Sequence, residues 1–370
     1  MGNLNMINLE TKNTVNNTVS VSANNATIPV SNFFEGKDIL VTGGCGSIGS
    51  EIVRQLLAFN PKRIRILDNS ETAHFNFNQT VQSDKIRNLV GDIRDRNRVM
   101  RAVEGCDIIF HAAALKHVPF CEYNPFEAVN TNIIGTQNLI DAATHHNVKV
   151  LVGISTDKAA NPISTLGATK LMMEKLITNN PGLIECNFCC VRFGNVLNSV
   201  GSIIPIFKKQ IAQGGPVTVT HKDMTRFFMS IDDAVKLVLK SAQMTESGEI
   251  FILKMDALKI VDLAEVMIQE LAPKHGFKPQ DIKIEYIGTR PGEKTDEILL
   301  TPEESNYALE KEDVFVLYNS IQAHYGKNHL SRDRSENSET LAKQRDYTSK
   351  NAPLLDKETI RALLYEKKIL

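Results

Sequence analysis

The chain lacks an excess of charge of either sign. Over 370 residues, 42 Lys and Arg stand against 43 Asp and Glu, which gives a formal net charge of −1. No overall field therefore draws the molecule to nucleic acid or to an anionic membrane. We expect neither of these partners and predict that the ligand is recognised at a local site.

Long apolar runs are also missing. No window reaches the roughly 18 consecutive apolar residues that a membrane-spanning helix needs. The N-terminus has no basic segment followed by an apolar stretch, the pattern of a secretory leader. We therefore expect that the chain is not exported and that it works in the cytoplasm.

The six cysteines show no disulfide framework, because they are scattered along a large chain. Cys186 and Cys189 form a CxxC motif inside ECNFCCVRFGN, an apolar run that predicts a buried strand. A metal or redox site is the alternative, but neither a second CxxC nor a nearby His pair completes one. The sequence favours buried thiols that behave as small apolar groups, and no metal site.

From Lys37 onward, short apolar runs alternate with amphipathic stretches. DILVTG, RIRILD, DIIFHAAA and VKVLVGIST have the length of strands, and SEIVRQLLAF has helical spacing. Strands separated by helices pair in parallel. The pattern predicts an α/β fold, a doubly wound parallel sheet of the Rossmann type, which binds ligands beyond the carboxyl ends of its strands.

The length exceeds what one hydrophobic core usually supports, so we expect about two structural units, interleaved in the sequence. After about Gly201, a turn-rich insert, a helical stretch and short strands suit a smaller substrate domain. We predict a flexible N-terminal extension at residues 1–32, a Rossmann domain at 33–200 to which 230–255 return, a substrate domain at 201–229 and 256–320, and a C-terminal tail with a terminal helix at 321–370.

A glycine-rich turn follows the first predicted strand in ILVTGGCGSIGSEIVRQLL. Glycines allow a tight turn and a close backbone approach, and the N-terminus of the helix that follows attracts a pyrophosphate. A turn that binds nothing is the alternative, but the strand and helix on either side favour a dinucleotide site. We assign the cradle to Gly43, Gly46, Ser47, Ile48 and Gly49.

An acidic residue ends the second predicted strand. Asp68 follows Gly46 by about 22 residues, where a carboxylate can accept hydrogen bonds from the adenosine ribose. The next residues, NSET, include neither Arg nor Lys. A 2′-phosphate would meet repulsion instead of a cation there, so the sequence favours NAD over NADP as the cofactor.

Turns after the next two predicted strands provide further cofactor candidates. They lie in GDIRD and FHAAALKH. We expect adenine and backbone contacts there, although a plain turn explains these segments almost as well. The candidates are Asp92, Ile93, Ala112, Ala113 and Ala114.

Seven motifs occur in the order of a known family: TGGCGSIG, HAAALKHVP, VNTNIIGTQNL, STDKAANP, VRFGNV, DMTRFFM and RPGEK. Over about residues 36–310 the chain resembles the extended short-chain dehydrogenase/reductases. More narrowly, it is similar to the nucleotide-sugar 4,6-dehydratases that act on UDP-N-acetylglucosamine, the polysaccharide-biosynthesis group. The joint occurrence of these motifs is more specific than any single one.

The resemblance implies a cycle in which the nicotinamide cofactor is not consumed. Hydride leaves the sugar C4, water is lost across C5 and C6, and hydride returns to C6. By analogy, Thr156 hydrogen-bonds the C4 oxygen, Asp157 is the acid and Lys158 is the base. We expect burial to favour a neutral form of the adjacent Asp157–Lys158 pair, with the proton on the aspartate.

One position departs from the wider superfamily. A tyrosine base stands four residues before the lysine of YxxxK there, whereas this chain has Leu166 before Lys170. Leucine cannot transfer a proton, so the base for C4 oxidation is open, and Asp157 acting through Thr156 is one hypothesis. The resemblance still implies that Lys170 reaches the nicotinamide ribose and that Asn132 supports the active-site helix.

A nucleotide sugar also needs cations for its pyrophosphate and an acid for its ribose. By their motifs, Arg226 and Arg290 are candidates for the phosphates and Glu293 for the ribose hydroxyls. Asn195 resembles a substrate-contacting asparagine, and Lys116 is expected near the sugar. Outside these motifs, each arginine would more often be a solvated surface residue.

The sequence thus favours dehydration of an NDP-N-acetylhexosamine, with UDP-N-acetylglucosamine as the preferred substrate. The alternatives are a 4-epimerase or reductase on the same scaffold, and a cofactor-binding regulatory protein without catalysis. UDP against GDP, and retention against inversion at C5, stay open.

The segment LGATKLMMEKLI predicts self-association. Its apolar residues exceed what one side of a helix can bury within its own chain. They are Leu171, Met172, Leu176 and Ile177. We expect a homodimer or a higher homo-oligomer.

Overall fold

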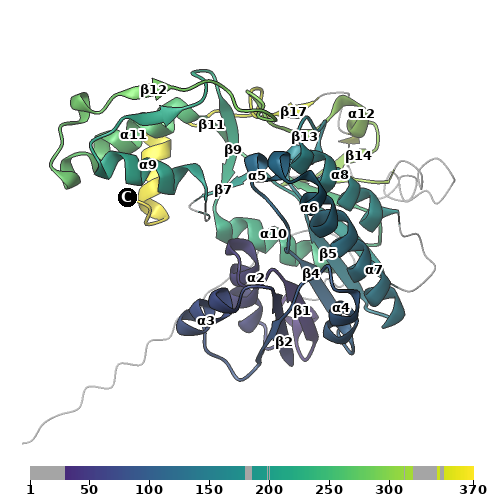
Figure 1. Ribbon diagram of the computed structural model, residues 1–370. Helices are drawn as coiled ribbons and strands as arrows, with labels where there is room; N and C mark the ends of the chain where they lie inside the picture. The colour runs from purple at the N-terminus through teal and green to yellow at the C-terminus, as the bar shows by residue number, and fades with distance from the viewer. Residues whose placement is uncertain are drawn as a thin grey trace, which may run out of the picture.

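The computed structural model describes residues 30–179, 186–197, 199, 201–311, 313–319, 340–341 and 346–370. Residues 1–29 of the predicted N-terminal extension lie outside these ranges, as do most of residues 321–345 of the predicted tail. Figure 1 shows the described residues as a large sheet layered with helices and a smaller region beside it.

One large sheet organises the fold. Its strands are β1 (Asp38–Thr42), β2 (Arg63–Asp68), β3 (Ile86–Val90), β4 (Ile108–His111), β5 (Val150–Ile154), β6 (Asn187–Arg192), β10 (Ile250–Leu253), β14 (Ala308–Glu310), β15 (Val314–Leu317) and β16 (Thr340–Leu341). They lie in the order β16-β14-β15-β10-β6-β5-β4-β1-β2-β3. The run from β10 to β3 is parallel, and β15, β14 and β16 pair antiparallel with their neighbours. Every residue of β1, β4 and β5 is buried, as expected of parallel strands covered on both faces.

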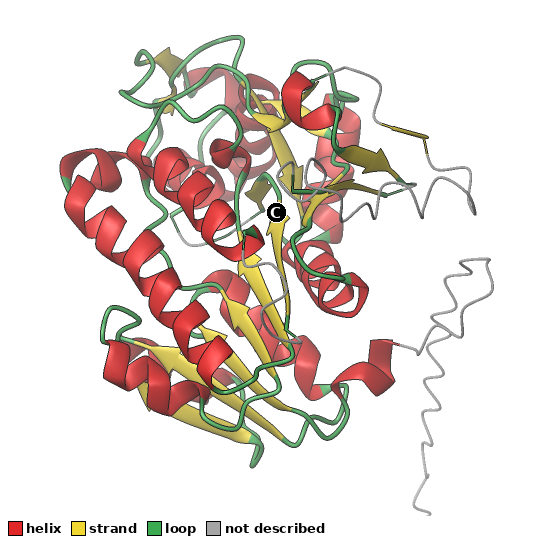
Figure 2. Ribbon diagram, turned by 90° about the vertical axis from the view of Figure 1, so that its right-hand side faces the viewer, coloured by secondary structure: helices red, strands yellow, loops and turns green. Residues whose placement is uncertain are grey.

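Helices cover both faces of this sheet. They are α1 (Val30–Phe34), α2 (Ser47–Leu57), α3 (Glu71–Thr80), α4 (Arg96–Val103), α5 (Val118–Tyr123), α6 (Pro125–Val129), α7 (Gly135–His145), α8 (Thr165–Thr178) and α10 (Ile231–Met244), and a π-helical turn at Asn130–Ile134 joins α6 to α7. α4, α7 and α8 pack together on one face, and α2 packs against α10 on the other (Figures 1 and 2). The predicted α/β fold with a doubly wound parallel sheet is confirmed.

The remaining elements form the smaller region and its links to the sheet. They are β7 (Asn195–Val196), α9 (Ile203–Ala212), β8 (Val217–Val219), β9 (Thr225–Met229), β11 (Ala257–Lys259), α11 (Ile260–Leu271), β12 (Ile284–Tyr286), β13 (Ile298–Leu300), α12 (Pro302–Ser305), β17 (Tyr347–Thr348) and α15 (Lys357–Glu366), with 3-10 turns at Asp157–Ala159, Pro273–His275 and Pro279–Asp281. α11 packs against α9 and α15 around a second apolar core that includes Phe207, Met267 and Leu364. Helix α15, at the position of the predicted terminal helix, therefore belongs to this smaller region.

The domain division proposed from the sequence stays a prediction, and the structure adds detail to it. β14 and β15 come from the segment assigned to the substrate domain, yet they extend the large sheet. Another pairing joins segments that are far apart in the chain: β17 pairs with β13. The C-terminal segment contributes β16 to the large sheet and α15 to the smaller region, and thus contacts both.

The cysteine prediction is confirmed for the CxxC motif. Cys186 and Cys189 are free and buried, and burial raises the pKa of the Cys189 thiol. Across the described ranges, no three His, Cys, Asp or Glu side chains gather so that they could hold a metal ion. Among the same residues, no helix has both the length and the apolar character to cross a membrane.

Helix α8 differs from expectation at Ile177, one of the residues assigned to self-association. Ile177 is fully buried, and a Cβ placed on Gly153 of β5 would lie only 2.4 Å from its Cδ1. It therefore packs under the sheet and not outward, which corrects the sequence assignment. Met172 is 47% exposed, and Leu171 and Leu176 are half-buried. Oligomerisation stays a prediction that rests on a smaller apolar face of this helix.

Candidate functional site

A cavity of about 1140 Å³ opens beyond the carboxyl ends of the parallel strands, the place where doubly wound sheets bind ligands. The turns that follow β1 to β6 and parts of the smaller region form its walls. Every catalytic, cofactor and substrate candidate from the sequence lines this cavity, with one exception. The exception is Asp157, which is fully buried.

Gly43 and Gly49, at the turn between β1 and α2, have no room for a side chain. Gly43 has a φ of +63°, and a Cβ there would lie 2.7 Å from both the Cα and the N of Ala113. A Cβ on Gly49 would lie 2.2 Å from the carbonyl oxygen of Gly43. Gly46 is the N-cap of α2 and makes no side-chain cap. The turn therefore brings bare backbone and a helix N-terminus to the cavity wall, as an anion site requires.

Asp68 at the end of β2 is tied to this turn. Its Oδ2 accepts a hydrogen bond from the Cys45 backbone amide at 3.2 Å, and its Oδ1 accepts one from the Ser70 amide at 3.1 Å. The carboxylate thus links the glycine turn to the N-cap of α3. Burial, followed by the charge of Asp68, raises the pKa of the neighbouring Cys45 thiol to about 12.

The turn after β3 places Asp92 and Ile93 at the cavity, together with a cation that the sequence analysis did not consider. Arg94 forms ion pairs with Asp92 and with Glu127, each at 2.7 Å. Its side-chain hydrogen bonds hold the pKa of Asp92 below the usual range. Because two carboxylates already neutralise Arg94, its attraction for a phosphate is reduced.

The third cofactor turn, after β4, is held by backbone hydrogen bonds. The Ala112 amide donates to the Thr42 carbonyl at 3.1 Å, and the Ala113 amide donates to the Thr42 hydroxyl at 3.3 Å. Ala114 continues this turn along the cavity wall. These contacts bring the turn against Gly43, so the two cofactor turns pack backbone to backbone.

Asn132 joins this loop to helix α8. Its side-chain amide donates to the Leu115 carbonyl at 3.1 Å and to the Thr169 hydroxyl at 3.0 Å, and its oxygen accepts from the Leu115 amide at 2.9 Å. This arrangement agrees with the supporting role that the resemblance implies. Lys116 follows in the same loop, where burial lowers its pKa.

On α8, Lys170 faces the cavity but Leu166 offers no proton carrier. The Lys170 ammonium donates to the Ile154 carbonyl at 2.8 Å, and burial lowers its pKa to about 8. Leu166 is only 3% exposed and packs in an apolar cluster with Cys121 and Ala128. The position of the superfamily tyrosine is therefore apolar, as the sequence indicated.

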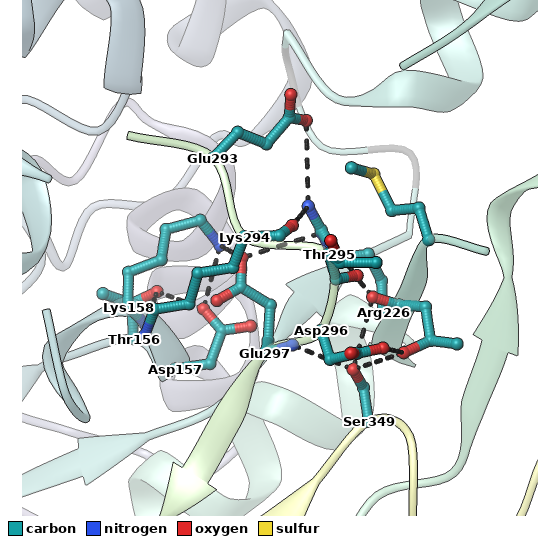
Figure 3. Close-up of polar contacts among 12 residues, drawn as sticks. Thr156, Asp157, Lys158, Arg226, Glu293, Lys294, Thr295, Asp296, Glu297 and Ser349 are labelled. Carbon is teal, nitrogen blue, oxygen red and sulfur yellow. Dashed lines mark hydrogen bonds and ion pairs between the residues drawn. The ribbon is translucent and has the colours of Figure 1, made fainter. Parts of the chain in front are cut away.

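The turn after β5 gathers a polar cluster. The cluster includes Glu297, a residue that the sequence analysis did not identify. The Thr156 hydroxyl and the Lys158 ammonium both donate to Asp157 Oδ1 at 2.9 Å. Glu297 adds a second ion pair, with its Oε1 3.1 Å from Lys158 Nζ. Figure 3 shows Lys158 between the two carboxylates. The one available signal was an acidic residue four positions after Glu293 of the RPGEK motif.

This second carboxylate changes the electrostatic surroundings of the Asp157–Lys158 pair. Burial acts to lower the pKa of Lys158, but the charges of Asp157 and Glu297 outweigh it and hold that pKa above its ordinary value. Burial and the charge of Asp157 raise the pKa of Glu297, against the opposing charge of Lys158. This direction opposes the neutral form of Lys158 that was expected from the sequence. The two carboxylates favour the charged form of Lys158, and burial favours the neutral form of Glu297.

Next to this cluster, Arg226 in β9 makes contacts different from those expected. Its side chain is only 7% exposed. Its guanidinium donates to the backbone carbonyls of Thr225, Lys294 and Thr295 at 2.7, 2.8 and 2.9 Å. Its Nε lies 3.6 Å from Glu297 Oε1. These contacts position the loop that carries Glu297, so its donors are largely engaged before any phosphate arrives.

The other substrate candidates remain at the cavity. Arg290 is exposed, and its backbone amide donates to Glu293 Oε2 at 3.1 Å. Glu293 also accepts from the Thr220 hydroxyl at 3.4 Å. Asn195, at the start of β7, is half-buried. The structure thus brings these residues to the same cavity, and their roles toward a ligand stay proposals.

A family comparison agrees with the motifs. The family described as polysaccharide biosynthesis protein matches residues 39–319, more than half of the chain. The chain belongs to this family. The resemblance inferred from the sequence motifs is thereby confirmed.

Three proteins that are similar to this chain have names that point to different activities or to none. An uncharacterized membrane protein of Methanocaldococcus jannaschii is 55% identical, over 91% of this chain and 98% of that protein. An inverting UDP-N-acetylglucosamine 4,6-dehydratase of Campylobacter jejuni is 40% identical, over 78% of this chain and 85% of its own. A UDP-glucose 4-epimerase of Rickettsia bellii is 37% identical, over 90% of this chain and 96% of that protein.

Solved structures of similar fold include Pen from Bacillus thuringiensis. It matches with a TM-score of 0.84 at 41% identity, over 91% of this chain and 99% of that chain. A dTDP-glucose 4,6-dehydratase of Streptomyces venezuelae was solved with NAD and TYD bound. It has a TM-score of 0.64 at 24% identity, over 70% of this chain and 86% of that chain. The second likeness shows that the fold is shared.

Proposed function

We propose that this protein is an NAD-dependent nucleotide-sugar 4,6-dehydratase whose substrate is UDP-N-acetylglucosamine. The observation that carries the proposal is the Thr156–Asp157–Lys158 cluster at the end of β5, beside a cavity large enough for a cofactor and a sugar nucleotide. Elimination across C5 and C6 needs an acid and a base together, which this cluster supplies. The dehydratase relative from Campylobacter jejuni supports the same substrate class.

The residues present fit NAD as the resident cofactor. Gly43 and Gly49 leave space for a pyrophosphate where any side chain would collide with backbone, and Gly46 presents the N-terminus of α2. Asp68 offers carboxylate oxygens to ribose hydroxyls and would repel a 2′-phosphate. Bound NAD would accept and return a hydride. Lys170 lines the cavity and would bind the nicotinamide ribose of NAD.

Each catalytic candidate then holds or moves a proton at a stated position. The Thr156 hydroxyl hydrogen-bonds the sugar C4 oxygen and passes the C4 proton to Asp157, to which it is already bonded. This route supplies the base that Leu166 cannot provide. Lys158 removes the C5 proton, and Asp157 returns its proton to the departing C6 hydroxyl. Arg290 and Glu293 bind the nucleotide, and Arg226 keeps the loop that carries Glu293 in place through the carbonyls of Lys294 and Thr295.

The product formed from UDP-N-acetylglucosamine tests this function. The purified chain with NAD should convert it to a 4-keto-6-deoxy sugar nucleotide that is lighter by one water, as read by mass spectrometry and NMR. A parallel reaction with the GDP sugar identifies the nucleotide. Unchanged mass with an altered C4 configuration would show the 4-epimerase instead. Binding without any product would favour the regulatory protein.

A further inference from the structure

The proposed dehydration leaves a proton unassigned, and the inference below rests on that function. Three transfers are needed: away from the C4 hydroxyl, away from C5, and onto the C6 hydroxyl. Asp157 and Lys158 must cover all three in the absence of a tyrosine. Lys158 can act as a base only after its own ammonium proton has moved to another group, and Asp157 already holds the C4 proton at that stage.

Glu297 lies where it can take the ammonium proton. Its Oε1 is 3.1 Å from Lys158 Nζ, and the residue borders the cavity while being only 2% exposed. Within the described ranges, its second oxygen, Oε2, is buried and has no hydrogen-bond partner. A buried carboxylate oxygen without a donor is costly, and protonation lowers that cost. The site thus contains a buried carboxylate whose protonation its surroundings favour.

The position of Glu297 is set by the C-terminal segment. Its backbone amide donates to the Ser349 hydroxyl, and its carbonyl accepts from the Ser349 amide, each at 2.9 Å. The Ser349 hydroxyl also shares a hydrogen bond of 2.7 Å with the Thr225 hydroxyl in β9. Figure 3 shows Ser349 on the far side of Glu297 from Lys158. Two elements distant in the sequence therefore fix this carboxylate beside the lysine.

Several charged groups surround the pair. Asp157 approaches Lys158 from the loop after β5, and Arg226 approaches Glu297 from β9, with its Nε 3.6 Å from Oε1. Lys294, on the same loop as Glu297, donates to the Ala160 carbonyl at 2.9 Å. Arg226 also lies near a second carboxylate, with its Nη2 3.7 Å from Glu293 Oε1, so it keeps an anionic partner when Glu297 is protonated. A proton that passes from Lys158 to Glu297 neutralises both groups and leaves the net charge of the cluster unchanged.

We propose that Glu297 is the proton partner of Lys158: it accepts the ammonium proton, so that neutral Lys158 removes the C5 proton while Asp157 holds the proton from C4. The Asp157 proton then leaves with the C6 hydroxyl as water, and the hydride taken from C4 is returned at C6. Lys158 protonates C5 again, and Glu297 gives its proton back to Lys158. The three side chains regain their starting charges, and the sugar has lost one water.

The Glu297→Gln variant tests this without any sugar, through the proton affinity of Lys158. In the protein purified without added sugar, acetylation of Lys158 by acetic anhydride is followed against pH by peptide mass spectrometry. We expect the midpoint in Glu297→Gln to fall below that of the wild type, because one of the two carboxylates that hold the ammonium charged is gone. An unchanged midpoint overturns the proposal. Glu303→Gln, on the exposed side of α12, is the matched control and should keep the wild-type midpoint.

The second measurement is the pH profile of C5 hydrogen exchange from UDP-N-acetylglucosamine in heavy water. The wild type should be nearly independent of pH around neutrality, because the proton moves internally. Glu297→Gln should be about 10²-fold slower near pH 7 and rise about tenfold per pH unit, because Lys158 must now lose its proton to solvent. Glu297→Asp should restore the flat profile. A flat profile in Glu297→Gln overturns the proposal.

Failure of the proposed function is recognised separately. If the wild type forms no dehydrated product, the dehydratase proposal fails. The acetylation midpoint of Lys158 still decides whether Glu297 controls that lysine.

Discussion

At the scale of single residues, burial limits which side chains of the proposed site can contact a ligand. Asp157 is fully buried and does not border the cavity, whereas Thr156 and Lys158 do. Both neighbours donate to the same oxygen of Asp157. In the proposed reaction, Asp157 would therefore exchange protons with the ligand through these two side chains, and the order of events can be separated by changing one residue at a time.

Replacing Lys158 by Ala should allow C4 oxidation and block every later step. Nicotinamide absorbance should then rise within one turnover, without deuterium entering C5 in heavy water. Asp157→Asn should block oxidation itself, because the proton route from Thr156 ends there. Each loss should be at least about 10²-fold, or about 2.7 kcal/mol of barrier. Normal turnover of Lys158→Ala would contradict its role as base. An Asp157→Asn enzyme that oxidises C4 normally would limit Asp157 to the elimination step.

We predict that the choice of cofactor depends on Asp68. Asp68→Ala should weaken NAD binding by about tenfold or more, because charge-assisted hydrogen bonds to the ribose are lost, with a smaller effect on NADP. The change also removes the acceptor for the Cys45 amide in the glycine turn. Calorimetric titration with both cofactors measures the ratio, and Asp84→Ala on the exposed turn before β3 is the control. Release of NADP as the tightly bound species from the native protein would argue against this assignment.

At the scale of secondary-structure elements, buried charge connects the strands to their helices. Arg192 in β6 is fully buried and pairs with Glu174 of α8 at 2.7 Å and with Glu304 of α12 at 2.9 Å. The Ser155 hydroxyl donates to Glu174 at 2.5 Å. Losing one partner of such a network costs about 3–5 kcal/mol, since the remaining charge stays buried. The network holds β6, α8 and α12 around the residue that precedes Thr156.

The glycine turn between β1 and α2 should tolerate no side chain at Gly43. Gly43→Ala suffers both the strain of a positive φ, about 1–2 kcal/mol, and a collision with Ala113. Gly36 has a similar φ of +68° but open space around its Cβ position, so Gly36→Ala isolates the strain. Urea unfolding should show the larger loss of unfolding free energy for Gly43→Ala, together with weakened NAD binding. Equal losses in the two variants would show that the close approach to Ala113 contributes nothing.

At the scale of the whole molecule, exposed apolar side chains favour a second copy of the chain as a partner. Tyr123 is 88% and Phe126 71% exposed on α5 and α6, which pack against α8, where Met172 is 47% exposed. Apolar groups exposed together commonly mark a protein contact. We expect a homodimer or larger assembly in sedimentation at micromolar concentration, and a shift toward smaller species for Phe126→Glu. Tyr286→Glu in the smaller region should leave the assembly unchanged. A monomeric wild type would contradict the prediction.

Local patterns in the sequence determined the fold class and one half of the site. Short apolar runs and helical spacing report directly on burial and backbone preference, so the doubly wound sheet could be predicted from them. The glycine turn and Asp68 lie at the ends of recognisable strands, and the STDK motif places Thr156, Asp157 and Lys158 side by side by covalent connection. These features need only neighbouring residues to be interpreted correctly.

Contacts between distant segments decided the rest. Glu297 reaches Lys158 because β13, β9 and the segment around Ser349 pack together, and no local pattern reports such a meeting. The same packing engages Arg226 with loop carbonyls and turns Ile177 inward under the sheet. Charge and burial at one site depend on groups from several elements, so the environment of Lys158 could not be predicted from its sequence neighbour alone. Only the tertiary structure placed the second carboxylate, Glu297, beside this lysine.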